Sequence, residues 1–154
     1  MAEASSGRTA AQVMANLGAA MLIVTLGFKF WTVLALAALA EAAADTSSSE
    51  IGMAFPGRTV LLTTGRTVAS GIDGGVSAVG SLAAIAAALS MAVSGLWLQL
   101  VLPWQVLVVA AAGVAGMLFD SLLGALWERK GYLNNDAVNL LGTVFAVAVA
   151  FLMV

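Results

Sequence analysis

Side chains suited to binding phosphate gather in one stretch of the chain, PGRTVLLTTGRTVASGIDGGVSAVG, at residues 56–80. An arginine can bind a phosphate through two parallel hydrogen bonds. A glycine-rich turn that leads into a helix presents backbone N–H groups to an anion. The stretch therefore predicts a phosphate-binding site formed by Arg58, Thr64, Arg66, Gly74, Gly75 and Ser77. It is not a Walker A loop, because the sequence contains no GK[ST].

Acidic residues accompany this stretch and recur beside the apolar runs that follow. Crowded carboxylates raise one another's pKa values unless a cation neutralises them. Hard oxygen ligands suit Mg²⁺, which keeps several waters and binds through one or two carboxylates plus substrate phosphates. The candidate metal ligands are Asp45, Glu50, Asp73, Asp120 and Asp136.

Two residue types that commonly carry chemistry are missing from the sequence. It has no cysteine, which excludes disulfides, thiolates and sulfur-bound metals, and no histidine, the usual base at neutral pH. Any chemistry must therefore use carboxylates, hydroxyls, amides and arginine. The net charge of -2 gives no indication of a nucleic-acid partner, and we expect none.

The composition is that of an integral membrane protein. Of 154 residues, 62% are hydrophobic and 9% are charged, whereas soluble domains carry about 25% charged residues. A spanning helix needs about 20 mostly apolar residues, so residues 1–154 form a single membrane domain with few spans. The polar first residues predict no cleaved signal peptide.

The positions of the charges divide the chain into five predicted transmembrane helices. Lys29 separates two uncharged runs, and Pro103 with a glutamine on either side, next to Trp97 and Trp104, marks an interface. The predicted fold is an all-α polytopic helix bundle with a loop at 46–75. Its spans are about 10–28, 30–45, 76–98, 104–127 and 137–154.

The basic residues predict the orientation of the bundle. Five spans put the termini on opposite sides, and Lys29 is the one basic residue on the side away from the N-terminus. By the positive-inside rule, the N-terminus and the 46–75 loop are cytoplasmic. We expect a protein of a bacterial cytoplasmic membrane with its site facing the cytoplasm. The basic residues on that side are Arg8, Arg58, Arg66, Arg129 and Lys130.

Asp120 lies inside a predicted span, where an acid is costly and by default suggests a functional site. Gly116, Asp120 and Gly124 follow an i, i+4, i+8 spacing, so the acid lies on a stripe of small residues. A neighbouring helix can approach such a stripe closely. Asp120 is therefore expected to face protein, with a purely structural hydrogen bond as the alternative.

Each remaining cluster has a structural explanation beside a functional one. Asn134, Asn135 and Asp136 could cap a helix, but Asn139 shares a face with Asn135 at i, i+4. The glycines could allow a turn and close packing. Both arginines of the loop could only fix the topology.

Five blocks, in order, resemble a membrane family long described as a domain of unknown function, which includes the plant phytyl-phosphate kinase of vitamin E synthesis. The resemblance covers about residues 8–145. It implies a helical membrane enzyme that phosphorylates a prenyl monophosphate with a nucleoside triphosphate, CTP or ATP. The blocks are RTAAQVMANLG, ADTSSSEIG, TTGRTVASGIDGGVSAVG, GMLFDSLLGA and LNNDAVNLLGT.

The resemblance also implies which positions form the site. Two departures are visible: the first block reads ANLG where the family has a glycine pair, and members usually carry further helices before it. A second copy could therefore close an incomplete lipid groove as a homodimer. The implied site residues are Asp45, Glu50, Asp73, Gly74, Gly75, Ser77, Asp120, Ser121, Asn134, Asn135, Asp136 and Asn139.

Three functions fit these residues. The leading prediction is a Mg²⁺-dependent kinase of an isoprenoid monophosphate, in which Asp73 and Asp120 bind the metal and Asn135 and Asn139 orient the reactants. The alternatives are a CTP-dependent prenol kinase or lipid-phosphate nucleotidyltransferase and, less favoured, a small transporter. A transporter needs polar groups at the midplane, and this sequence concentrates them toward one side.

Overall fold

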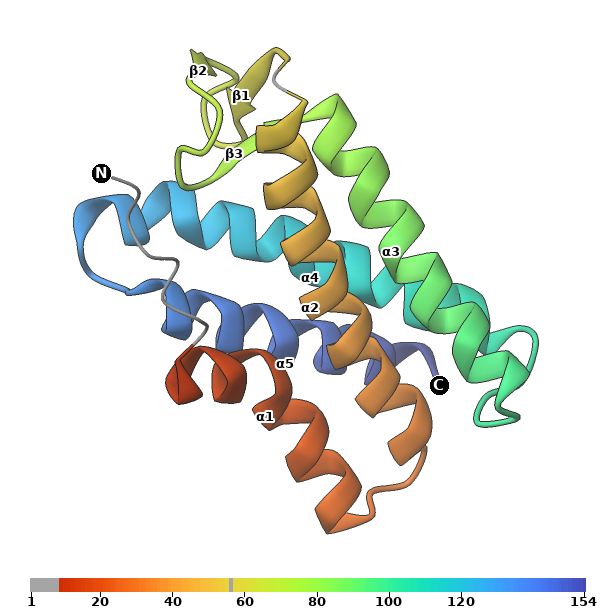
Figure 1. The fold of residues 1–154 in the computed structure, drawn as a ribbon. Helices are drawn as coiled ribbons and strands as arrows, with labels where there is room; N and C mark the ends of the chain where they lie inside the picture. Colours follow the sequence, from red (N-terminus) through yellow and green to blue (C-terminus); the bar gives the residue numbers. More distant parts are fainter. Residues whose placement is uncertain (1–8, 56) are drawn as a thin grey trace.

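Helix α2 lies at the centre of a five-helix bundle and packs against the other four α-helices of the described chain (Figure 1). The computed structural model describes residues 9–55 and 57–154, so Arg8 lies outside the described residues. The all-α prediction is confirmed. The helices are α1 (Ala10–Leu26), α2 (Trp31–Ala54), α3 (Ala78–Trp97), α4 (Gln105–Leu126) and α5 (Asn135–Met153), with a short 3₁₀ turn, η1 (Glu128–Lys130), after α4.

Side-chain caps set the beginnings of three helices. Thr9 Oγ1 accepts from the Gln12 amide at 3.3 Å, and Gln12 Oε1 accepts from the Thr9 amide at 2.9 Å, which together form a capping box. Ser77 caps α3 and Asn134 caps α5 by accepting backbone N–H groups. These contacts satisfy donors that the first turn of a helix leaves unpaired.

A small antiparallel sheet covers one end of the bundle. Its strands are β1 (Thr59–Leu61), β2 (Thr67–Val68) and β3 (Gly75–Ser77), in the order β2-β1-β3. Thr59 pairs with both Val68 and Ser77. In Figure 1 the sheet lies beside the end of α2 and the beginning of α3. We call this the polar end of the bundle.

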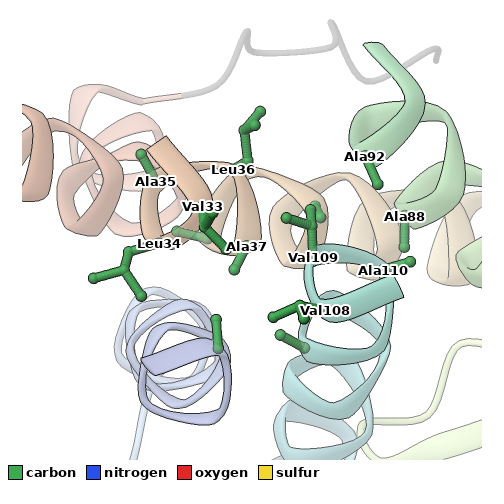
Figure 2. Packing of buried hydrophobic residues seen from close by; sticks show 14 of the residues in the cluster. Val33, Leu34, Ala35, Leu36, Ala37, Ala88, Ala92, Val108, Val109 and Ala110 are labelled. Atoms are coloured by element: carbon green, nitrogen blue, oxygen red, sulfur yellow. The ribbon is translucent and has the colours of Figure 1, made fainter. Parts of the chain in front are cut away.

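The opposite half of the bundle has a core of small apolar side chains. Figure 2 shows α2 residues packed against α3 and α4 there. Ala37, Ala88, Ala92 and Val109 have no exposed surface. Such small side chains let helices approach closely in a membrane bundle. This half contains no buried acid among the described residues.

The helix lengths differ from the predicted spans at one place. Helix α2 continues to Ala54, so residues 46–54 are helical rather than part of a loop, and β1 and β2 are short strands within the remaining segment. By length and composition, α3, α4 with η1, and α5 could each cross a membrane, and α1 is a shorter apolar helix. Helix α2 carries Glu41, Asp45 and Glu50. Orientation relative to the cytoplasm stays a prediction.

Candidate functional site

Four acidic residues from separate parts of the chain surround one cavity of about 170 Å³ at the polar end, which we call the acidic cavity. They are Asp45 of α2, Asp73 of residues 71–74 between β2 and β3, which we call the glycine turn, Asp120 of α4, and Glu128 of η1. None of the described residues that line this cavity is basic. A cavity with this lining attracts cations. Its other polar side chains are Ser48, Ser49, Thr59, Ser70, Ser77, Ser121 and Asn135.

Close packing between the glycine turn and α4 places Asp73 at this cavity. Gly74 has φ +74°, and a Cβ there would overlap Ala125. A Cβ at Gly124 would lie 2.8 Å from the Gly74 nitrogen. Only glycine fits these two positions, because one needs a left-handed backbone and both leave no room for a side chain. The close packing expected of these glycines is therefore present, and phosphate binding by the turn stays a prediction.

Asp120 is the acid most fully enclosed by helices at this cavity. Its side chain is 9% exposed, and its Oδ2 has no hydrogen-bond partner within the protein. A buried carboxylate oxygen without a partner is costly unless a cation, a water or a substrate satisfies it. The predicted stripe is confirmed, since a Cβ at Gly116 would meet α2 and α5 and one at Gly124 the glycine turn.

A second polar cavity adjoins the first and is lined mainly by α1, α2 and α5. We call it the amide cavity, because four amide side chains, Gln12, Asn16, Asn135 and Asn139, line it. Asp45, Thr46, Ser49 and Glu50 complete the lining. It shares Asp45, Ser49 and Asn135 with the acidic cavity.

The structure divides the predicted phosphate-binding residues into two groups. Gly74, Gly75 and Ser77 line the acidic cavity. Arg58, Thr64 and Arg66 are exposed and line neither polar cavity. The arginines lie next to or between the short strands β1 and β2, and this hairpin presents them to solvent. Phosphate contacts inside the cavity would therefore come from backbone N–H groups, serines and a bound cation.

The predicted metal ligands are also divided. Asp45, Asp73 and Asp120 line the acidic cavity, Glu50 lines only the amide cavity, and Asp136 lines neither. Among the described residues, no three acidic groups lie close enough together to enclose an ion. The donor set still fits Mg²⁺, because this ion is usually held by one or two carboxylates together with water and phosphate oxygens.

Asparagines at the start of α5 have distinct roles. Asn134 is the cap, since its Oδ1 accepts from the Ala137 amide at 2.9 Å. Asn135 lines both polar cavities, and Asn139 is buried and lines the amide cavity. The structural explanation therefore applies to Asn134, and the functional role of Asn135 and Asn139 stays a prediction.

Two acids, one at the acidic cavity and one buried next to Asp120, were missed by the sequence interpretation. Glu128 was absent from the candidate residues, although it follows Asp120 by eight residues and so continues the stripe through Gly124. Glu41 was also absent from the candidate residues. It precedes Asp45 by four residues, and the reasoning that identified Asp120 as a membrane-embedded acid applies to it equally.

Glu41 lies in the interior of the bundle, where α2, α4 and α5 meet. Its side chain is 1% exposed, and neither carboxyl oxygen has a hydrogen-bond partner within the protein. Glycines provide the space: a Cβ at Gly116 would lie 2.5 Å from Glu41 Cγ, and one at Gly142 would lie 2.5 Å from Glu41 Oε1. The Gly142 position is also 3.3 Å from Asp120 Cβ, so both acids border the same glycine.

Comparison with known proteins identifies relatives from archaea, cyanobacteria and plants. An uncharacterised membrane protein of Methanocaldococcus jannaschii, MJ0933, is 38% identical over 123 residues, which are 80% of this chain and 51% of the relative. The chloroplastic protein VTE6 of Arabidopsis thaliana is 37% identical over 112 residues, 71% of this chain and 34% of the relative. The Synechocystis membrane protein sll0875 is 32% identical over 125 residues, 80% of this chain and 48% of the relative.

The chain thus spans about half the length, or less, of these curated relatives. No solved structure matches it. Residues 1–147 match the family described as integral membrane protein DUF92, which agrees with the resemblance found in the five sequence blocks. The chain therefore belongs to the integral membrane DUF92 family.

Proposed function

We propose that this protein is a Mg²⁺-dependent kinase that converts an isoprenoid monophosphate into the diphosphate with a nucleoside triphosphate. The observation that carries the proposal is the pair of adjoining polar cavities at one end of an apolar bundle. One is rich in carboxylates and suits a metal-bound triphosphate, and the other is rich in amides and suits the acceptor phosphate. The five sequence blocks resemble a family that includes the plant phytyl-phosphate kinase, and this resemblance supports the same reaction class.

The acidic cavity is assigned to the metal. Asp120 and Asp73 would hold Mg²⁺, with Asp45 on the opposite helix, because these three carboxylates line it together. When bound, such an ion would neutralise negative charge on the phosphates during phosphoryl transfer. The unpartnered Oδ2 of Asp120 supports this assignment, since a bound cation would satisfy it.

The amide cavity and the glycine turn would position the reactants. Asn135 lines both cavities and can donate from its amide toward either phosphate. An oxygen of the acceptor monophosphate attacks the γ-phosphorus, the bond from that phosphorus to the β,γ-bridging oxygen breaks, and a nucleoside diphosphate leaves. A phosphate monoester is already mostly ionised near pH 7, so the reaction needs no strong base. That agrees with the absence of histidine.

The test is an assay of the purified full chain with Mg²⁺. Geranylgeranyl or phytyl monophosphate is supplied with ATP or CTP in separate reactions, and the free alcohols serve as matched acceptors. We expect the diphosphate from the monophosphate and little product from the alcohol. Efficient phosphorylation of the alcohol, with no diphosphate formed from any donor, would overturn the proposal in favour of a prenol kinase.

A further inference from the structure

A third cavity continues from the amide cavity into the apolar part of the bundle. We call it the apolar groove; its volume is about 360 Å³, and it shares Asn16 and Thr46 with the amide cavity. Its other lining residues are Val13, Leu17, Leu39, Ala42, Ala43, Ser47 and Met91. The acidic cavity, the amide cavity and the apolar groove therefore form a continuous series, because each neighbouring pair shares residues.

Three helices form the apolar groove. Helix α2 contributes Leu39, Ala42 and Ala43, α1 contributes Val13 and Leu17, and α3 contributes Met91. Figure 1 shows α1 and α3 on opposite sides of α2. The small alanine side chains of α2 leave the hollow, while larger apolar side chains border it.

The groove opens on the surface of the bundle. Val13 is 42% and Leu17 is 37% exposed, whereas Asn16, which is shared with the amide cavity, is 9% exposed. The lining thus changes from the buried amide of Asn16 to exposed apolar side chains along its length. An amphiphile with one polar end and one apolar chain matches this change.

We propose that the apolar groove binds the isoprenoid chain of the acceptor while the amide cavity binds its phosphate. This proposal rests on the proposed function and assigns the lipid to particular helices. The chain would enter from the bilayer between α1 and α3, and its phosphate would lie beside Asn16, Asn135 and Asn139. Asp45, which lines both polar cavities, then lies between the acceptor and the triphosphate.

Carboxylates in the amide cavity are compatible with this assignment. Asp45 and Glu50 line it and would repel an isolated phosphate. The amide groups of Gln12, Asn16, Asn135 and Asn139 can donate hydrogen bonds, and a cation held at Asp45 would offset the repulsion. Occupation of the cavity by the acceptor phosphate is therefore expected to depend on Mg²⁺.

The first test changes the groove and measures chain-length preference. Ala43→Phe fills the groove, and we expect it to raise KM for geranylgeranyl monophosphate about 10-fold more than for geranyl monophosphate, because an apolar pocket discriminates by the space it offers. The KM for the nucleotide should not change. Ala111→Phe is the matched control, since Ala111 is exposed on α4 and lines none of the three cavities.

A second variant and a binding measurement keep the test decisive if Ala43→Phe misfolds or if the purified protein is inactive. Met91→Ala enlarges the groove and should relax the preference toward longer chains. A photoreactive geranylgeranyl monophosphate, with the reactive group at the end of its chain, should label α1 and α2 residues of the groove in the wild-type protein. Unlabelled geranylgeranyl monophosphate should compete, and Ala43→Phe should reduce the labelling.

Several results would overturn this assignment separately from the proposed function. If the wild-type protein forms the diphosphate but the groove variants leave the chain-length preference unchanged, or if labelling maps to another surface, the groove does not hold the chain. If Ala43→Phe instead abolishes a homodimer without changing that preference, the groove is a protein interface. If photolabelling maps to the groove and no diphosphate forms, the groove assignment stands and the proposed kinase function fails.

Discussion

Two portions of α2, residues 31–40 and 41–54, show how one helix can build both the core and the site. In the first portion, residues such as Val33 and Ala37 are buried in the apolar core (Figure 2). In the second portion, Glu41 is equally buried, and Asp45 lines both polar cavities. The helix is continuous, so the difference lies in its side chains and their neighbours.

Glycines bring helices close together in both halves of the bundle, but the side chain that they approach differs. At Gly113 a Cβ would lie 2.8 Å from Ala40 Cβ, so this glycine brings α4 against an apolar side chain. At Gly116 and Gly142 the neighbouring group is Glu41. Close approach through small residues therefore forms a dense apolar core in one half and encloses carboxyl groups in the other. Four experiments test this contrast, from the largest expected effect to the smallest.

Removing the charge of Asp120 should have the largest effect. We expect Asp120→Asn to lower diphosphate formation about 100-fold or more, because an electrostatic group at a reacting phosphate contributes on this scale. The measurement is turnover as a function of Mg²⁺ concentration. Asp136→Asn is the matched control, since Asp136 lines neither polar cavity. Unchanged activity and Mg²⁺ dependence in a normally inserted Asp120→Asn protein would make the acid structural.

Replacing Glu41 by an apolar side chain of similar size should separate stability from activity. Glu41→Met removes two buried oxygens that have no partner in the protein, so we expect a higher melting temperature in detergent. Because Gly142 borders both Glu41 and Asp120, repacking there should displace Asp120, and we expect turnover to fall about 10-fold, a trade-off between stability and activity. Leu36→Met, in the apolar half, should change both quantities little. A lower melting temperature for Glu41→Met would show that the carboxyl is satisfied by a bound water or ion.

Adding a methyl group beside Glu41 should destabilise the bundle. Gly142→Ala places a Cβ 2.5 Å from Glu41 Oε1, and we expect a loss of about 1–3 kcal/mol, typical of overpacking. Gly18→Ala is the control, since its Cβ would meet only Met14 Cε at 3.8 Å and alanine favours a helix by up to about 1 kcal/mol. Thermal unfolding in detergent should therefore shift in opposite directions. A stable Gly142→Ala protein would mean that Glu41 moves freely.

Conservative changes of the exposed arginines should have the smallest effect. Arg58→Lys and Arg66→Lys keep the charge but lose the planar fork that binds phosphate through two hydrogen bonds. Because both residues lie outside the cavities, we expect turnover to change by about 2-fold or less, as for ordinary surface positions. A loss of 10-fold or more in either variant would indicate that the hairpin folds over the bound nucleotide during the reaction.

Composition and charge spacing are strong predictors of the membrane bundle in this protein. The long uncharged runs of the sequence correspond to α3, α4 and α5. The polar residues Ser77 and Asn134 cap α3 and α5. The spacing of Gly116, Asp120 and Gly124 correctly predicted an acid on a closely packed face. These features are local, because helix periodicity and capping depend on neighbours within a few turns.

The sequence by itself determined the helical membrane class, the concentration of polar residues at one end and the position of Asp120 on a closely packed helix face. Only the tertiary structure decided that Glu128 joins the acidic cavity, that Glu41 is enclosed beside Gly142, and that both arginines of the hairpin remain outside. The physical reason is that these outcomes depend on contacts between α2, α4, α5 and a small sheet. Side chains far apart in the sequence come into contact there, and the periodicity of a single segment does not predict such contacts.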